Sequence, residues 1–285
     1  MVARATRARA VDSHGRRRLA AYHSAAMLVA IDIGNTNITF AAFEAGVPGE
    51  IGRTPTDAGA SAADLSGALG ELADAYEFVV ASVVPALTER IAELAGRRGA
   101  RLLVADHTNV PIGVGVERPA EVGADRLVNA FAALRLHGAP AVIVDFGTAT
   151  TFDVLDADGA YAGGAIAPGL QLSVEALAER TAQLPNIVLA APPHAIGRNT
   201  LEAMQSGAVL GYLGLVRTLI EAIRAELAAA GAPPPRVILT GGLSAAPWAT
   251  AIAGVTAIDP ALTLRGLALL HAELRASAGV RAAAP

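Results

Sequence analysis

A strand followed by a glycine turn occurs twice in this chain, and the repeat limits the fold more than any other feature. The first copy reads Leu28-Val-Ala-Ile-Asp32-Ile-Gly-Asn-Thr36 and the second Val142-Ile-Val-Asp145-Phe-Gly-Thr-Ala-Thr150, with the two aspartates 113 residues apart. Each copy leads into a further β-branched or aromatic run, 38–43 and 150–155, and then into a turn. This repeat predicts two homologous halves of mixed α/β structure, each opening on antiparallel strands.

Apolar periodicity predicts the remaining elements of both halves. In the first half we expect strands at 78–84 and 101–105 and helices at 87–99 and 121–137. In the second half we expect a long helix at 199–230, a strand at 237–239 and a last helix at 263–276. Gly207, Gly211 and Gly214 lower the helix propensity of the long helix by about 1 kcal/mol each, so we expect close packing or a break there. Trp248 is expected to pack in the core.

The length of 285 residues, with 53% hydrophobic residues, is enough for about two domains. We place their boundary near His137-Gly-Ala-Pro140, which gives an N-terminal domain at 27–138 and a C-terminal domain at 139–276. The arginine-rich opening, residues 1–26, lacks the apolar run of a secretory signal and is expected to be a disordered leader. Residues 277–285 are expected to form a tail.

The charge of the chain argues against a nucleic-acid partner. Residues 1–26 hold six arginines and one aspartate, so the remainder has 16 arginines against 25 acids, a net charge of −9. The longest uncharged stretches, 160–174 and 203–216, are too short or too rich in glycine and proline to supply the roughly 20 apolar residues of a membrane span. We therefore expect a cytoplasmic protein that does not span a membrane.

The chain contains no cysteine and no lysine, since all 22 basic residues are arginines. Disulfides and thiolate chemistry are excluded, as are the phosphate-binding lysine of a P-loop and the strand lysine of protein kinases. A nucleotide would have to be bound by groups other than a lysine side chain.

Three glycine loops supply such groups: Asp32-Ile-Gly-Asn-Thr-Asn37, Asp145-Phe-Gly-Thr-Ala-Thr-Thr151 and Thr240-Gly-Gly242. Glycine lets the backbone approach a polyphosphate, and successive amide N–H groups form an anion-binding concavity. Asp32, just before the first turn, is placed to hold a hydrated Mg²⁺. One such aspartate alone is more often an ordinary turn residue. Two copies and a third loop together favour a nucleotide cleft between two halves.

The three loops resemble the phosphate and adenosine motifs of the superfamily that contains acetate and sugar kinases, heat-shock proteins and actin. Five further segments, in order, resemble the signatures of the type III pantothenate kinase family: Gly123-Ala-Asp-Arg126, 145–153, Gly163-Gly-Ala-Ile-Ala-Pro-Gly169, Arg180-Thr-Ala-Gln-Leu-Pro185 and Gly197-Arg-Asn-Thr200. The resemblance covers about 27–276. It implies two duplicated actin-like, ribonuclease H-like α/β domains, with mixed sheets flanked by helices and a nucleotide cleft between them.

The resemblance also implies an activity, namely ATP-dependent phosphorylation of the primary hydroxyl of pantothenate to 4′-phosphopantothenate, the first step towards coenzyme A. Asp125 would be the base that accepts the hydroxyl proton, although a helix cap or a surface ion pair explains most such aspartates outside this context. Asp145 would hold an activating potassium or ammonium ion. The first loop and Thr148 would bind ATP, with the loop contributing Asp32, Ile33, Gly34, Asn35, Thr36, Asn37, Ile38 and Thr39.

The implied pantothenate site consists of Gly123, Ala124, Asp125, Arg126 and Thr200. Many family members carry a tyrosine in the segment where this chain has Val116-Glu-Arg-Pro119, so a hydroxyl contact is missing at Val116. One lost hydrogen bond costs about 0.5 to 1.5 kcal/mol, which affects affinity more than identity.

Two other functions stay open at this point. The first is a nucleotide-binding regulator without kinase turnover, and the second is a kinase for another hydroxylated acid or sugar, because a superfamily cleft does not fix the acceptor. The resemblance further implies a homodimer built on helices of the second half, with the acceptor site close to the interface.

Overall fold

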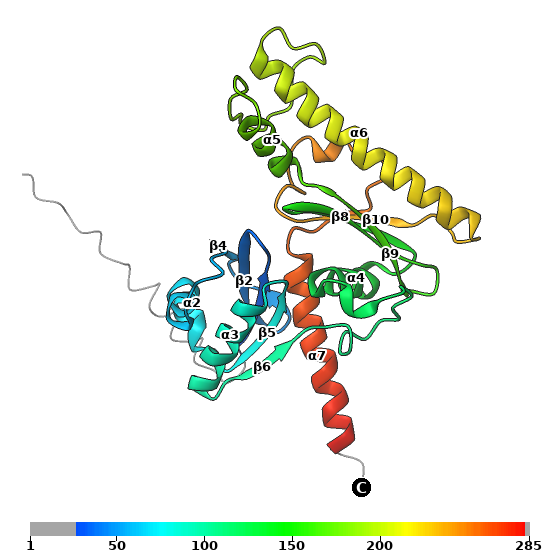
Figure 1. Cartoon of the computed structure of the whole chain (residues 1–285). Helices are drawn as coiled ribbons and strands as arrows, with labels where there is room; N and C mark the ends of the chain where they lie inside the picture. Colours follow the sequence, from blue (N-terminus) through cyan, green and yellow to red (C-terminus); the bar gives the residue numbers. More distant parts are fainter. Residues whose placement is uncertain (1–26, 283–285) are drawn as a thin grey trace, which may run out of the picture.

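Two mixed β-sheets with two helices between them form the centre of the molecule, as the computed structural model shows (Figure 1). The structure describes residues 27–282, so the predicted leader at 1–26 lies outside the described residues. The mixed-sheet α/β prediction is confirmed, and the domain boundaries at 138 and 276 stay predictions.

The first sheet has the order β3-β2-β1-β5-β6, with β4 also paired to β2. The second sheet has the order β11-β10-β7-β8-β9. The strands are β1 (Leu28–Ile33), β2 (Asn37–Glu44), β3 (Val47–Pro48), β4 (Gly52–Pro55), β5 (Glu77–Ser82), β6 (Arg101–Val104), β7 (Ala141–Phe146), β8 (Ala149–Leu155), β9 (Tyr161–Pro168), β10 (Arg236–Thr240) and β11 (Ala257–Ile258).

The two sheets share one topology. In each, the first strand pairs antiparallel with the next strand and parallel with a later one, as β1 does with β2 and β5, and β7 does with β8 and β10. This equivalence confirms the duplication that the repeated motif predicted. It also places the two glycine turns at equivalent corners of the two sheets.

The helices largely follow the predicted order. They are α2 (Ala62–Leu69), α3 (Pro85–Arg98), α4 (Ala124–His137), α5 (Leu170–Glu179), α6 (Thr200–Ala229) and α7 (Leu262–Ala282), with short 3-10 turns at Gly70–Asp74, Pro119–Glu121 and Ala249–Ala251. The prediction that the helix ending at His137 begins near Glu121 was wrong by about one turn. Gly123 precedes the first turn of α4, and Pro119 starts a separate 3-10 turn instead.

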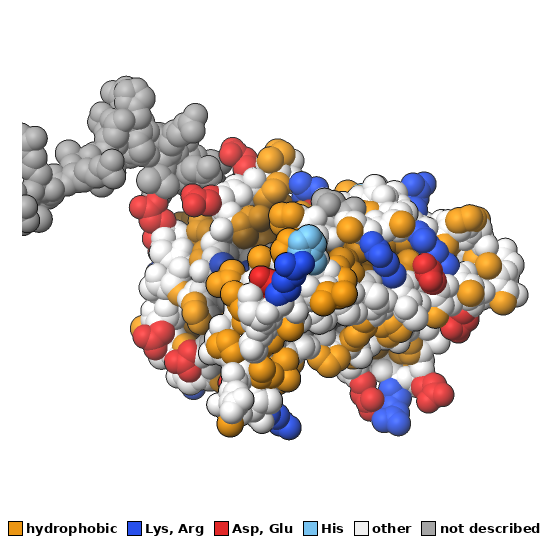
Figure 2. All heavy atoms as spheres, turned by 90° about the horizontal axis from the view of Figure 1, so that it is seen from above, with side chains coloured by type: hydrophobic (Ala, Val, Ile, Leu, Met, Phe, Trp, Pro, Cys, Tyr) orange, Lys and Arg blue, Asp and Glu red, His pale blue; other side chains and the backbone are white. Residues whose placement is uncertain are grey.

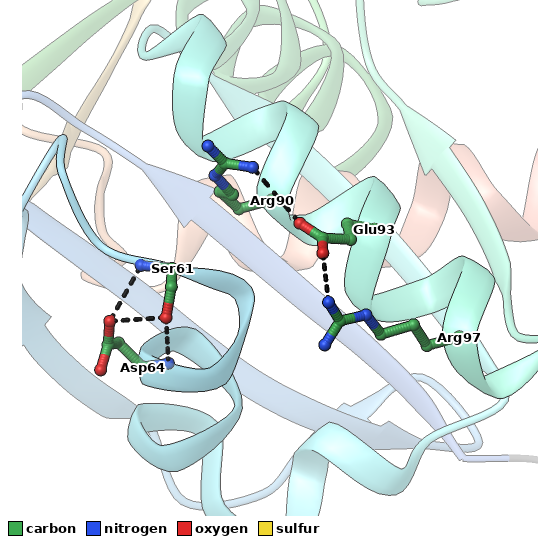
Figure 3. Close-up of polar contacts among 5 residues, drawn as sticks. All are labelled: Ser61, Asp64, Arg90, Glu93 and Arg97. Atoms are coloured by element: carbon green, nitrogen blue, oxygen red, sulfur yellow. Dashed lines mark hydrogen bonds and ion pairs between the residues drawn. The ribbon is translucent and has the colours of Figure 1, made fainter.

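Local signals in the sequence fix the ends of α2 and α3. Ser61 caps α2 in a capping box with Asp64, in which the amide of each residue donates to the side chain of the other (Figure 3). Helix α3 begins at Pro85 and ends before Gly99, which has a φ of 64°. On the exposed face of α3, Arg90 and Arg97 both pair with Glu93 (Figure 3).

Helices α4 and α7 lie between the two sheets and join them through one core (Figure 1). Residues of β1, such as Ala30, and of β7, such as Ile143, belong to the same apolar cluster as Phe131 of α4 and Leu267 of α7. Helix α7 thus returns from the second half of the chain to pack against the first sheet. This shared core fixes how the two glycine turns face each other.

Helix α6 runs unbroken through Gly207, Gly211 and Gly214, so the predicted break was wrong. A Cβ on any of these glycines would meet nothing within 4 Å, so the described chain does not pack closely against them either. The opposite face of α6, including Val209 and Val216, is buried in the core of the second half. There Trp248 packs edge-on against Phe146 and Tyr212, each with a ring-centre distance of 5.7 Å, which confirms its packing role.

Helix α6 is also long and apolar enough to cross a membrane by length and composition, unlike any other helix in residues 27–282. This is weak evidence, because the core helix of a soluble protein passes the same test. The buried residues on one face of α6 are those of a helix packed on a protein core.

Candidate active site

The first and second glycine loops touch each other across the two halves. Thr36 follows β1 and Thr148 follows β7, and their hydroxyl oxygens lie 2.7 Å apart. Both threonines are exposed to solvent, so their hydroxyls and the adjacent amides are accessible to a ligand. The structure therefore brings together two loops that are 112 residues apart in sequence.

Three aspartates converge beside these loops. Asp32 is the penultimate residue of β1, Asp145 is the penultimate residue of β7, and Asp125 lies in the first turn of α4. Burial raises the pKa of Asp32 well above its usual range, and the charges of Asp125 and Asp145 raise it further. Burial also raises the pKa of Asp145, to about 7, with added contributions from Asp125 and Asp153. The three carboxylates are therefore near enough for the charges of Asp125 and Asp145 to act on Asp32.

Several partly buried carboxylates near one another favour a bound cation, because it offsets their mutual repulsion. No group of three or more His, Cys, Asp or Glu side chains lies within reach of a single ion anywhere in the described residues. Mg²⁺ is usually held by one or two carboxylates together with water and substrate phosphates. Asp32 and the neighbouring loop fit such an ion better than a fully protein-enclosed metal site.

Asp125 is held by the start of α4. Its Oδ1 accepts the amide N–H of Arg126 at 2.9 Å, and its side chain is half-buried. Burial raises the pKa of Asp125, while the hydrogen bond from Arg126 and the charge of Arg126 oppose the rise. A carboxylate with a raised pKa accepts a proton more readily than a free aspartate does, which suits a general base.

A buried ion pair that the sequence did not reveal fixes Arg126. Its Nε donates to Oδ1 of Asp153 at 2.7 Å, and the Asp153 side chain is fully buried on β8. Tyr161 donates its hydroxyl to the same oxygen at 2.9 Å, and Thr151 donates to the other oxygen at 3.1 Å. The one sequence signal for this ion pair was an acidic residue inside the apolar run Phe152-Asp-Val-Leu155, because a charge buried in a strand is normally paired.

Neutral groups surround Asp145. Asn129 of α4 donates from Nδ2 to Oδ2 of Asp145 at 3.0 Å, and Thr263 of α7 donates to the amide oxygen of Asn129 at 2.8 Å. The third glycine loop packs against Oδ1 of Asp145. Gly241 has a φ of 85°, and a Cβ there would lie 2.3 Å from Oδ1 of Asp145, so only glycine fits. The three glycine loops therefore meet around Asp145.

The other predicted site residues divide into two groups. Gly34, Asn35, Thr36, Asn37 and Thr39 are at least partly accessible on the first loop and the start of β2. The side chains of Ile33 and Ile38 are buried in the core of the N-terminal half, and that of Ala124, the first residue of α4, is buried in the core between the sheets, so these three can offer a ligand only backbone groups. Val116 is partly buried against the core that contains α4.

Thr200 is not brought to the aspartates within one chain. It is the first residue of α6, and this end of α6 lies beside α5, away from α4 (Figure 1). There it lines a cavity of about 690 Å³ together with residues such as Leu177, Ile187 and Met204. A site shared by Asp125 and Thr200 would need a second chain.

Comparisons with known proteins agree with this geometry. The sequence model of type III pantothenate kinase matches residues 28–222. A type III pantothenate kinase of Thermomicrobium roseum is 46% identical over 263 residues, which are 89% of this chain and 100% of the relative. One of Rhodospirillum rubrum is 44% identical and covers 86% of this chain and 98% of the relative.

Solved structures confirm the fold. A protein from Campylobacter jejuni described as a Baf family transcriptional activator aligns with a TM-score of 0.57 at 17% identity, covering 87% of this chain and 98% of that one. A protein from Listeria monocytogenes described as an N-acetylmannosamine kinase aligns with a TM-score of 0.52 at 12% identity, covering 88% and 100%. The fold is thus that of actin-like ATPases and sugar kinases, and the chain belongs to the type III pantothenate kinase family.

Proposed function

We propose that the protein transfers the γ-phosphoryl group of ATP to the primary hydroxyl of pantothenate, giving 4′-phosphopantothenate and ADP. The observation that carries the proposal is the contact between the first two glycine loops beside Asp32 and Asp145, with Asp125 near enough for its charge to act on both aspartates. Membership of the family supplies the acceptor. A cytoplasmic location, where both substrates are made and used, completes the proposal.

In the proposed site, the first loop binds the triphosphate through its amides and through the side chains of Asn35 and Thr36. Thr148 adds a hydroxyl from the second loop, which its contact with Thr36 supports. Asp32 would hold the Mg²⁺ that accompanies ATP and neutralises charge on the phosphates. Asp145 would hold a potassium or ammonium ion, with Asn129 keeping its second oxygen oriented.

Asp125 acts as the general base. Its carboxylate accepts the proton of the pantothenate hydroxyl, and the hydroxyl oxygen forms a bond to the γ-phosphorus as the bond from that phosphorus to the β,γ-bridging oxygen breaks. ADP leaves with the electron pair of the broken bond. Gly123, Ala124 and Arg126 would line the acceptor site beside Asp125, and the ion pair with Asp153 keeps the Arg126 side chain in place.

We also propose a homodimer formed through α6 and the segment before it. Large apolar side chains are exposed there, with Val188 and Ile196 more than four-fifths exposed and Leu201 and Leu210 nearly half exposed. Apolar side chains are spread over the face of the molecule seen in Figure 2. Exposed apolar surface of this kind is typical of protein interfaces. A partner's α6 could then bring its Thr200 to the acceptor site.

The function is tested by assaying pantothenate phosphorylation with ATP and Mg²⁺, with and without potassium. The wild-type protein should be active, and Asp125→Asn should lose at least about a hundredfold in kcat while still binding ATP. Asp158→Asn, a matched change on an exposed turn, should be fully active. An Asp125→Asn protein with near-normal turnover would refute the assigned base. Nucleotide binding without turnover by the wild type on any pantothenate-like acceptor would favour a regulator.

A further inference from the structure

Arg53, which sequence motifs did not single out, lies in one row with Asp32. Arg53 of β4 is directly opposite Thr39 of β2, and Thr39 is directly opposite Asp32 of β1. Opposite residues of antiparallel strands project from the same face of a sheet. The side chain of Arg53 therefore shares the face that carries Asp32.

The guanidinium of Arg53 reaches the other half of the molecule. A Cβ on Gly242 of the third loop would lie 3.1 Å from one terminal nitrogen of Arg53 and 3.3 Å from the other. The side chain thus extends from the first sheet to a loop of the second, across the space that the three aspartates face. Arg53 is exposed, and within residues 27–282 its guanidinium makes no ion pair or hydrogen bond.

The electrostatics of the site agree with this position. Burial and the charges of Asp125 and Asp145 raise the pKa of Asp32, and Arg53 is the one charge that acts in the opposite direction. The other arginine of the site, Arg126, is already paired with the buried Asp153. Arg53 is therefore the cation that is free to meet a ligand near Asp32.

A triphosphate needs such a cation here. The chain has no lysine, the glycine loops contribute only amides and hydroxyls, and three carboxylates face the site. Transfer of a phosphoryl group depends on neutralising the charge on its oxygens, and a guanidinium can bind two phosphate oxygens at once.

We infer that Arg53 binds the terminal phosphoryl group of ATP and stabilises its charge during transfer. This rests on the proposed kinase function, because it assigns a residue to the same site. The equivalent row of the second sheet supports the assignment. There Asp145 lies opposite Thr151 and Thr151 lies opposite Ile166, so the position that matches Arg53 carries no charge. The arginine is thus not a requirement of the repeated fold.

The test uses full-length Arg53→Gln and Arg53→Lys proteins, with Arg90→Gln on the exposed face of α3 as the matched control (Figure 3). Two quantities are measured: kcat/KM for ATP in the pantothenate assay, and the Kd values of ADP and of a non-hydrolysable ATP analogue by calorimetry. Arg53→Gln should lower kcat/KM about a hundredfold, and Arg53→Lys should recover part of that loss. The analogue should bind about tenfold more weakly to Arg53→Gln, with the ADP affinity changed less than about threefold. Arg90→Gln should behave as wild type.

Two results would overturn the inference. One is wild-type kcat/KM in Arg53→Gln. The other is equal weakening of ADP and of the ATP analogue, which would mean that Arg53 only holds the third loop in place. If the wild-type protein phosphorylates no pantothenate, the proposed function fails instead, and the comparison of ADP with the ATP analogue still tests Arg53.

Discussion

Replacing Arg126 with methionine should destabilise the protein by removing the partner of a buried carboxylate. The Arg126 side chain is 17% exposed and Asp153 is fully buried, with 2.7 Å between Nε and Oδ1. Methionine keeps most of the apolar stem, so the main change is the loss of charge. Breaking a buried ion pair by removing one partner costs about 3–5 kcal/mol. The hydroxyls of Tyr161 and Thr151 still donate to Asp153 in the variant, so we expect the lower end of this range. Arg126→Met should lower the free energy of unfolding by about 3 kcal/mol at pH 8.

The penalty should also depend on pH, with a sign that follows from the pKa of Asp153. Burial raises this pKa to about 6 in the folded protein, and Arg126 opposes the rise. A carboxyl with a raised folded-state pKa contributes stability at low pH, and that contribution is lost as the pH rises through the folded-state pKa. In the wild type, the stability that Asp153 contributes at low pH is therefore fully lost once the pH is above about 6. In Arg126→Met the pKa is higher, so stability continues to fall above pH 6 by up to about 1.4 kcal/mol per pH unit.

The assay is urea unfolding at pH 6 and pH 8, followed by the fluorescence of Trp248, the single tryptophan. Arg135→Met is the matched control on α4, because the Arg135–Glu273 pair is over a third exposed and should contribute about 1 kcal/mol or less at either pH. In an Asp153→Asn background, most of the pH dependence of Arg126→Met should disappear. A penalty below about 1 kcal/mol at pH 8, or an equal penalty at both pH values, would refute the reasoning.

Three further predictions concern catalysis and assembly. Gly169→Ala places a Cβ 2.3 Å from the carbonyl oxygen of Thr148 and should displace the second loop, which should raise KM for ATP about tenfold. Gly67→Ala on α2, where a Cβ would meet nothing within 4 Å, should leave KM unchanged. Because burial raises the pKa of Asp125, kcat/KM for pantothenate should fall on the acid side with a midpoint above the pKa of free aspartate, about 3.9, and a midpoint at or below that pKa would contradict this. A Cβ at Gly211 would meet nothing within 4 Å among residues 27–282, so Gly211→Leu should convert the proposed dimer to a folded monomer in light scattering. An unchanged dimer mass would exclude that face.

Much of the fold was predictable because its signals are local and occur twice. The strand and turn after Asp32 and after Asp145 each need only a short apolar run and a glycine, and their repetition predicted two equivalent sheets. The unbroken course of α6 was not predictable from its glycines. Their propensity cost is small beside the burial of the opposite face in the core, and tertiary packing decided the outcome.

The site was predictable only where a motif carried it. Asp125 and the glycine loops belong to short segments with recognisable composition, so their residues could be named before their arrangement was known. Arg53 and Tyr161 belong to no motif: Arg53 lies in line with Asp32 through strand register, and Tyr161 contacts Asp153 through packing of neighbouring strands. Thr200 stays a prediction from the family resemblance, and no sequence pattern indicates that it lies at the start of α6, beside α5. Such relations depend on tertiary structure.

The duplicated sheets place two equivalent aspartates in different surroundings, which bears on the two different ions that we propose for them. Asp32 and Asp145 occupy the same position in β1 and β7, and each faces a threonine on the next strand. Beyond that threonine the first half has the cation Arg53 and an open first loop, whereas the second half surrounds Asp145 with the amide of Asn129 and the backbone of Gly241. A carboxylate beside a guanidinium and a triphosphate site suits a hydrated divalent ion shared with phosphate. Beside Asp145, Asn129 and Gly241 contribute only neutral dipoles, while Asp125 and Asp153 add negative charge. These surroundings favour a bound cation, in line with the monovalent ion that we propose for Asp145.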